Sequence, residues 1–106
     1  MNIEYRNNNV RKLCEDEQYA LKRLPQNVAQ SLGSLMYKLN SCCSFNEFSN
    51  NPANKKYNLH PLKGEKKGLI ALYIDYHYRM TIKILVKNVN GTDKIKIWEV
   101  SNHYGD

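Results

Sequence analysis

Residues 79–100 read RMTIKILVKNVNGTDKIKIWEV, and this stretch decides the fold class. Apolar residues alternate with Arg79, Thr81 and Lys83 in its first half, which is the two-residue period of a strand with one buried face. Residues 88–91, NVNG, are a hairpin signal, and the alternation resumes over residues 94–100. The stretch therefore predicts two antiparallel strands that share one apolar face and one polar, basic face.

The segment before this stretch predicts a helical layer. In residues 26–42 the apolar side chains follow the spacing of one helix face, at Val28, Ala29, Leu32, Leu35, Met36 and Leu39. Residues 9–24 predict one further helix, which Pro25 ends. Residues 2–5 and 69–74 read as strands, and residues 44–56 read as a loop with one helical turn. Residues 1–106 are thus expected to form a single α+β domain, in which an N-terminal two-helix hairpin packs on one face of a small, mostly antiparallel twisted β-sheet.

The positive charge of the chain is concentrated in one short segment. The formal net charge is +6, and residues 55–67 hold five lysines against Glu65, a net of +4. These lysines are Lys55, Lys56, Lys63, Lys66 and Lys67. Clustered charge of this kind attracts polyanions such as RNA. The alternative is a loop whose charge serves only solubility.

Several other classes of protein are not expected from this sequence. The three cysteines are Cys14, Cys42 and Cys43, and they form neither a CxxC pair nor a complete disulfide framework, so no metal or other cofactor is expected. No apolar run approaches the ~20 residues that a membrane-spanning helix needs. The N-terminal residues lack the apolar stretch of a signal peptide, and we therefore expect a cytoplasmic protein without a membrane partner.

Residues 59–68 read LHPLKGEKKG, lead into a predicted strand, and are followed by Tyr78-Arg79-Met80. This order of motifs resembles the RelE/ParE superfamily of toxins from type II toxin–antitoxin systems, in particular its HigB-like branch. The resemblance covers residues 57–104. It implies a metal-independent endoribonuclease that cuts mRNA on the ribosome. It also implies a cognate antitoxin, of the helix-turn-helix HigA-like kind, as the partner that holds the toxin inactive.

Cleavage of RNA by its own 2′-OH group requires a proton acceptor, positive charge on the phosphate, and a proton donor for the leaving 5′-oxygen. Arg79 is the first candidate for the phosphate, because a guanidinium is permanently charged and binds two oxygens at once. Lys63 is the second. His60 is the candidate for proton transfer, since histidine titrates near neutral pH. The other basic residues of the cluster are expected to bind the RNA backbone, and they are Lys55, Lys56, Lys66 and Lys67.

The C-terminal segment carries the remaining candidates. HigB-like chains often end in Asp-Tyr-His, whereas this chain has Asn102, His103 and Tyr104. An amide at position 102 cannot act as a base, so Asn102 is expected only to contact RNA. His103 and Tyr104 are both candidate catalytic residues, as a second acid or base and as a proton donor or stacking group. Of the remaining aromatic residues, Tyr73 and Trp98 are expected in the core.

Two alternative functions stay open at this point. One is a non-catalytic inhibitor, as in the ParE branch of the superfamily, which acts on DNA gyrase through contacts alone. The other is an RNA-binding module without cleavage activity, which the amide of Asn102 keeps in consideration. Neither alternative requires His60 or Arg79.

Overall fold

The computed structural model describes residues 1–102, with residue 89 through its backbone only. The elements in chain order are β1 (Asn2–Tyr5), α1 (Asn8–Glu15), α2 (Glu17–Arg23), α3 (Gln26–Ser41), α4 (Phe45–Asn50), the 3-10 helix η1 (Pro52–Tyr57), β2 (His60–Pro61), the 3-10 helix η2 (Gly64–Lys66), β3 (Ile70–Asp75), β4 (Tyr78–Val89) and β5 (Thr92–Asn102).

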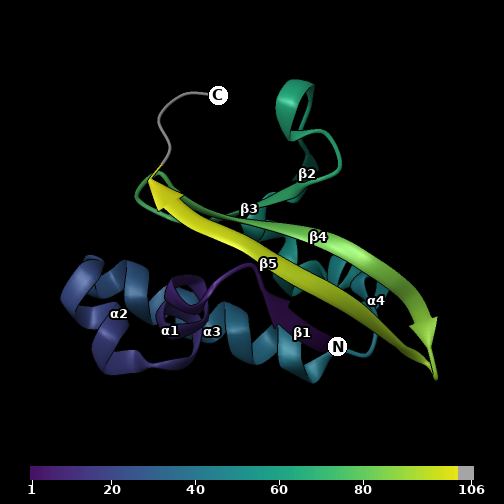
Figure 1. Cartoon of the computed structure of the whole chain (residues 1–106), viewed down its shortest axis with the longest axis horizontal. Coiled ribbons are helices and arrows are strands. Elements are labelled where there is room, and N and C mark those ends of the chain that lie inside the picture. Colours follow the sequence, from purple (N-terminus) through teal and green to yellow (C-terminus); the bar gives the residue numbers. More distant parts are fainter. Residues whose placement is uncertain (103–106) are drawn as a thin grey trace.

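The strands form one sheet in the order β1-β5-β4-β3-β2. β1 is parallel to β5, and every other neighbouring pair is antiparallel, so the prediction of a mostly antiparallel sheet is confirmed. β4 and β5 pair from Tyr78, opposite Asn102, to their turn at residues 90–91. Their hairpin reaches well past the ends of the other strands (Figure 1).

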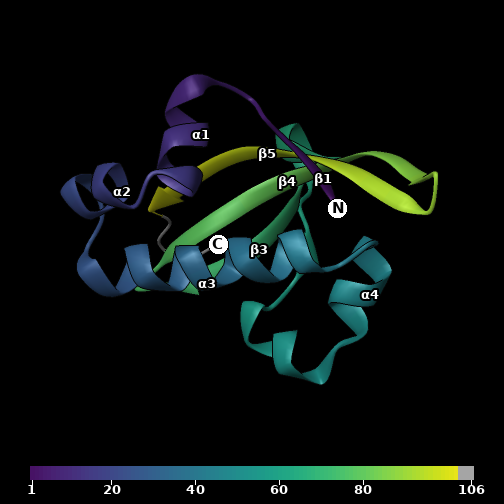
Figure 2. The same ribbon diagram turned by 90° about the horizontal axis from the view of Figure 1, so that it is seen from below.

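The predicted helical layer covers one face of this sheet. Seen from below, α3 runs across the sheet with α1 and α2 beside it (Figure 2). α3 buries one continuous stripe of apolar side chains, as its spacing predicts. The stripe packs into a core whose sheet side consists of Leu72, Met80, Ile82, Ile95 and Ile97, all completely buried. The prediction that an N-terminal helical layer packs on one face of the sheet is therefore confirmed.

The prediction of a single helix over residues 9–24 was wrong, because the segment is divided at Asp16. This residue has extended backbone angles, with φ −111° and ψ 103°. Its side chain accepts a hydrogen bond of 3.1 Å from the backbone N–H of Tyr19. Aspartate is a preferred N-cap because its carboxylate accepts from such an unpaired N–H group. The first arm of the hairpin is thus two short helices, α1 and α2.

Residues 44–56, predicted as a loop with one helical turn, instead fold into α4 and most of η1 and add to the core. The rings of Phe48 and Tyr57 stack with their centroids 5.8 Å apart. The buried amide of Asn54 donates a 2.9 Å hydrogen bond to the carbonyl of Phe48. β2 then joins the edge of the sheet, and the η2 segment rises on the side opposite the helices (Figure 1).

Asp93 connects the β4–β5 hairpin to the turn between α3 and α4. Its buried carboxylate accepts hydrogen bonds from the backbone N–H groups of Phe45 at 2.9 Å and Asn88 at 2.8 Å. The backbone N–H of Asp93 in turn donates to the carbonyl of Cys43 at 2.9 Å. The two bonds from backbone N–H groups lower the pKa of the Asp93 carboxyl, because they stabilise its charged form.

We expect Asp93→Asn to lower the melting temperature at pH 7. We also expect the melting temperature of this variant to decrease less than that of the wild type as the pH is lowered. A carboxyl whose pKa is lower in the folded than in the unfolded protein stabilises the fold above its unfolded pKa of about 3.9. That contribution disappears as the pH falls from there through the folded pKa. Melting temperatures of both proteins between pH 7 and pH 2.5 test this. Glu65→Gln, at an exposed carboxylate, is the control, and parallel curves for wild type and Asp93→Asn would contradict the assignment.

Candidate functional site

The face of the sheet that the helices leave uncovered carries the polar half of the β4 alternation. Arg79, Thr81 and Lys83 lie on this face, while Met80 and Ile82 between them are completely buried on the helical side. We call it the helix-free face. The strand register arranges its side chains in rows, and the candidate site is built from two of those rows.

Arg79 occupies the first row, between Tyr73 of β3 and Ser101 of β5. It is 7% exposed, so its guanidinium is held largely out of bulk water. Charge in such surroundings acts more strongly on a bound anion than charge in water does. Arg79 therefore lies on the face that alternation predicts, and its burial restricts the movement of its charged guanidinium.

His60 begins the second row, which runs through Ala71 and Thr81 to Glu99. Its ring Nδ1 lies 2.8 Å from the backbone carbonyl of Asn58. A carbonyl oxygen only accepts hydrogen bonds, so Nδ1 carries the hydrogen in this contact. In the neutral ring Nε2 is then the basic nitrogen, which suits His60 to accept a proton.

The lysine-rich segment that follows His60 forms a short lobe over the same face. The backbone N–H of Leu62 donates to the carbonyl of Leu69 at 2.9 Å, which closes the base of the lobe. Gly64 and Gly68 have φ values of +70° and +97°, a conformation that other residues rarely adopt. These turns present three exposed lysines, Lys63, Lys66 and Lys67, which we call the lysine lobe.

The structure brings His60, Arg79 and the lysine lobe to one face. Standard strand spacing puts the Cα atoms of His60 and Arg79 roughly 12 Å apart, two strands across and two residues along. Side chains of this length can both reach a phosphodiester placed between them. The second row begins in the edge strand β2, where the lobe also begins.

The other predicted residues lie elsewhere. Lys56 belongs to η1, and its Nζ lies 5.4 Å from the ring of Tyr57, which Lys38 of α3 also approaches. Lys55 is its exposed neighbour in η1, so this pair stands beside the helical layer and apart from the lysine lobe. Asn102 ends β5 opposite Tyr78. The predicted catalytic residues His103 and Tyr104 lie outside the described residues.

The prediction that Tyr73 and Trp98 belong to the core was wrong. Tyr73 is 43% exposed. Trp98 lines a surface pocket of about 400 Å³ on the helix-free face, together with Arg6, Lys83 and Glu99. None of these three pocket residues was predicted to be functional. Trp98 lies on the face opposite the buried Ile95 and Ile97, as strand alternation places it, and a β-bulge, which alternation does not reveal, brings Glu99 beside it.

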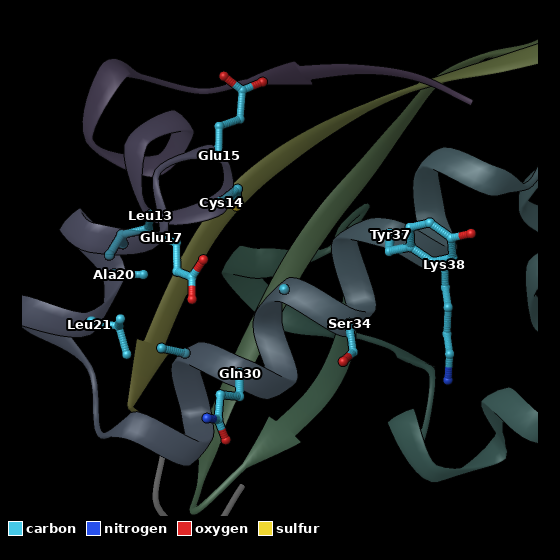
Figure 3. Close-up of a pocket in the computed structure, with 12 residues that line it drawn as sticks. Leu13, Cys14, Glu15, Glu17, Ala20, Leu21, Gln30, Ser34, Tyr37 and Lys38 are labelled. Atoms are coloured by element: carbon cyan, nitrogen blue, oxygen red, sulfur yellow. The ribbon is translucent and has the colours of Figure 1, made fainter.

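A larger pocket, of about 630 Å³, lies between α1, α2 and α3 on the opposite side of the molecule (Figure 3). Its lining includes Cys14 but neither histidine nor arginine. Burial, with a smaller contribution from Glu15, raises the pKa of the Cys14 thiol to about 12. The thiol is therefore protonated at neutral pH and is a poor nucleophile. The groups suited to RNA chemistry lie on the helix-free face instead.

Among residues 1–102, no group of three or more His, Cys, Asp or Glu side chains is placed to hold a metal ion. The helices in the same range are also too short or too polar to cross a bilayer.

No protein-family model matches the chain, and no curated protein sequence matches it. Solved structures do share its fold. The YoeB/ParE toxin from Agrobacterium tumefaciens has a TM-score of 0.61 and 13% identity, over 98% of this chain and 100% of the toxin. A YafQ mutant from E. coli has a TM-score of 0.61 and 24% identity, over 95% of this chain and 91% of YafQ. A chain of the YoeB–YefM complex from Staphylococcus aureus has a TM-score of 0.57 and 16% identity, over 98% of both chains.

These likenesses define the class of fold: it is that of the RelE/ParE-like toxins, as the sequence motifs predicted. Among the structures that share it are YoeB and YafQ toxins, and the YafQ fold also occurs in a complex of YafQ with DinJ from E. coli.

The cysteines provide a direct check of the burial described above. At pH 8, iodoacetamide should modify the exposed Cys43 well before Cys14, whose high pKa leaves almost no thiolate. Peptide mass spectrometry after a time course of labelling measures both rates. Equal rates in the folded protein would contradict the raised pKa, and unfolding in urea should make the rates converge.

Proposed function

We propose that this protein is the toxin of a toxin–antitoxin system and cleaves mRNA on the ribosome. The observation that carries the proposal is the meeting of His60, Arg79 and the lysine lobe on one face of a toxin-like fold. The Leu-His-Pro-Leu-Lys-Gly motif at residues 59–64, which resembles the HigB-like branch, lies at the edge of this same face. Its substrate, translated mRNA, is cytoplasmic.

The proposed chemistry uses the RNA itself as nucleophile. The ribose 2′-oxygen attacks the adjacent phosphorus, the bond from phosphorus to the 5′-oxygen breaks, and the products carry a 2′,3′-cyclic phosphate and a 5′-hydroxyl. His60 accepts the 2′-OH proton through Nε2. Arg79 and Lys63 stabilise the charge that develops on the phosphoryl oxygens. His103 and Tyr104 are the sequence candidates for protonating the leaving 5′-oxygen.

The proposed partner is a cognate antitoxin. YoeB and YafQ have been solved in complexes with YefM and DinJ. By analogy, a neighbouring gene would encode a protein that covers the basic face of this chain. The HigB-like motif favours a HigA-like helix-turn-helix antitoxin, and acidic residues in its binding segment would complement the lysine lobe.

A second candidate function is RNA binding without cleavage. It is favoured by Asn102, whose amide stands where the HigB-like pattern has a carboxylate. Gyrase inhibition by contacts alone is the third candidate, from the ParE branch. Both differ from the proposed nuclease in one measurable way, because neither generates new RNA ends.

Mapping of mRNA 5′ ends after brief induction tests the nuclease. Wild-type protein should create new 5′-hydroxyl ends within translated regions, and Arg79→Ala should reduce them about 100-fold or more, as expected for loss of a transition-state charge. Arg79→Lys should restore only part of the activity, since it keeps the charge but loses the bidentate fork.

Arg11→Ala, at an exposed arginine on α1, is the matched control and should cleave normally. Because Arg79 is buried, the melting temperature of each variant must be measured to separate misfolding from lost chemistry. Growth arrest without new ends would favour the binding alternatives, and equal cleavage of untranslated RNA would show that the ribosome is dispensable.

The lysine lobe predicts a defined dependence of RNA binding on salt. Each contact between a lysine and a phosphate of single-stranded RNA adds about 0.7 to the negative slope of log affinity against log salt. Lys63→Ala should therefore lower the slope by about 0.7. Lys22→Ala, on α2, should leave it unchanged. Fluorescence anisotropy of a labelled oligoribonucleotide between 50 and 300 mM KCl measures the slope. Identical slopes for the wild type and Lys63→Ala would show that Lys63 does not contact RNA phosphate.

A further inference from the structure

The pocket around Trp98 is a second feature of the helix-free face, and the proposed cleavage chemistry does not use it. Arg6, the residue after β1, lies on one side of the pocket, and Lys66 and Lys67 of the lysine lobe lie on the other. Lys83 of β4 and the pair Trp98 and Glu99 of β5 form the floor. The pocket has a volume of about 400 Å³, which is comparable to small-ligand sites.

A β-bulge brings Glu99 to the same face as Trp98, so that both line this pocket. Thr81 pairs with Glu99 and Ile82 pairs with Ile97, so Trp98 is one extra residue on β5. In a regular strand, consecutive side chains point to opposite faces, so Trp98, next to the buried Ile97, faces away from the core and Glu99 would face into it. Here Trp98 and Glu99 line the same pocket. Bulges commonly redirect a side chain in this way next to functional sites.

The charges of the pocket are arranged around one carboxylate. Glu99 Oε2 lies 3.8 Å from Arg6 Nη2, and Glu99 Oε1 lies 4.0 Å from Lys66 Nζ. Glu99 thus stands between two cations that come from opposite ends of the pocket. Both pairs are long and partly exposed, so each contributes little stability. A phosphate, which carries charge of the same sign, can replace this carboxylate at small cost.

The aromatic surface of the pocket is paired with a cation. The Arg6 guanidinium lies over the Trp98 ring, 5.2 Å from its centroid. Nucleobases stack on tryptophan rings and on guanidinium planes. An anionic ligand with a flat ring matches this combination, whereas an acidic peptide would use only the cations.

We propose that this pocket is a nucleotide-binding subsite for single-stranded RNA, in which a base stacks on Trp98 or Arg6 and a phosphate displaces Glu99 from Arg6 and Lys66. The proposal rests on the proposed function, because it assigns a second contact to the same RNA. The row that holds Glu99 also holds His60, about 14 Å away across three strand spacings. One RNA strand several nucleotides long reaches both.

The test uses Trp98 as its own reporter, since it is the single tryptophan of the chain. Pentauridylate, titrated at constant ionic strength, should quench the tryptophan emission with saturation. Inorganic phosphate and pentaglutamate at the same concentrations should not, because neither carries a ring that stacks. Emission unchanged by pentauridylate, or equal quenching by all three ligands, would overturn the subsite.

Binding of fluorescein-labelled pentauridylate to variants gives an independent measure. Trp98→Leu should weaken binding about tenfold and Trp98→Phe should largely restore it, as expected for stacking. Glu99→Gln should tighten binding by up to about fivefold, since it frees two cations. A merely structural role for Glu99 predicts weaker binding instead, and that result would overturn the proposal. Lys22→Ala is the control and should bind as wild type does.

The two proposals fail in different ways. Arg79→Ala should lose cleavage and still show quenching by pentauridylate. If Trp98→Leu binds and cleaves RNA as wild type does, the subsite is wrong and the nuclease stands. If wild-type protein is quenched by RNA but generates no mRNA ends, the nuclease is wrong and the subsite stands as an RNA-binding site.

Discussion

The pairing of β4 with β5 is the constraint on which the rest of the structure depends. This long antiparallel ladder gives the sheet two faces of opposite character, because successive side chains alternate between them. The apolar face must be covered, and α3 covers it with its own stripe. Since the helices take that face, the polar side chains of β4 remain on the other one. The separation of core from candidate site is therefore a direct consequence of one hairpin.

The same ladder positions the candidate functional residues. Arg79 lies in a row with Tyr73 and Ser101, and the next row joins His60 to Glu99. Residues far apart in the sequence, such as His60 and Glu99, are thus brought into one row by backbone register rather than by side-chain contacts. The bulge at Trp98 interrupts this order where the strand passes the lysine lobe. A regular ladder would have turned Glu99 toward the core residues instead.

The connection between α3 and β3 has two parts with different roles. Its first part, α4 and η1, closes the core through Phe48 and Tyr57. Its second part crosses the edge of the sheet at β2 and forms the lysine lobe on the helix-free face. Lysines that are neighbours in the basic segment consequently lie in two places. Lys56 stands near α3, and only the later lysines join His60 and Arg79.

Much of this architecture follows from local sequence patterns. Alternation in residues 79–86 and 94–100, and the helical stripe of residues 26–42, determined the elements, their buried faces and the side on which Arg79 lies, because those periods depend only on backbone geometry. The resemblance of residues 57–104 added the fold class. The break at Asp16 is also local, since its carboxylate caps the N–H of Tyr19, but the helical period of residues 9–24 does not reveal it. Two features depended on tertiary structure: the division of the lysines, and the position of Glu99 beside Trp98. The first arises from contacts between distant segments and the second from an irregular strand register, which no local period encodes.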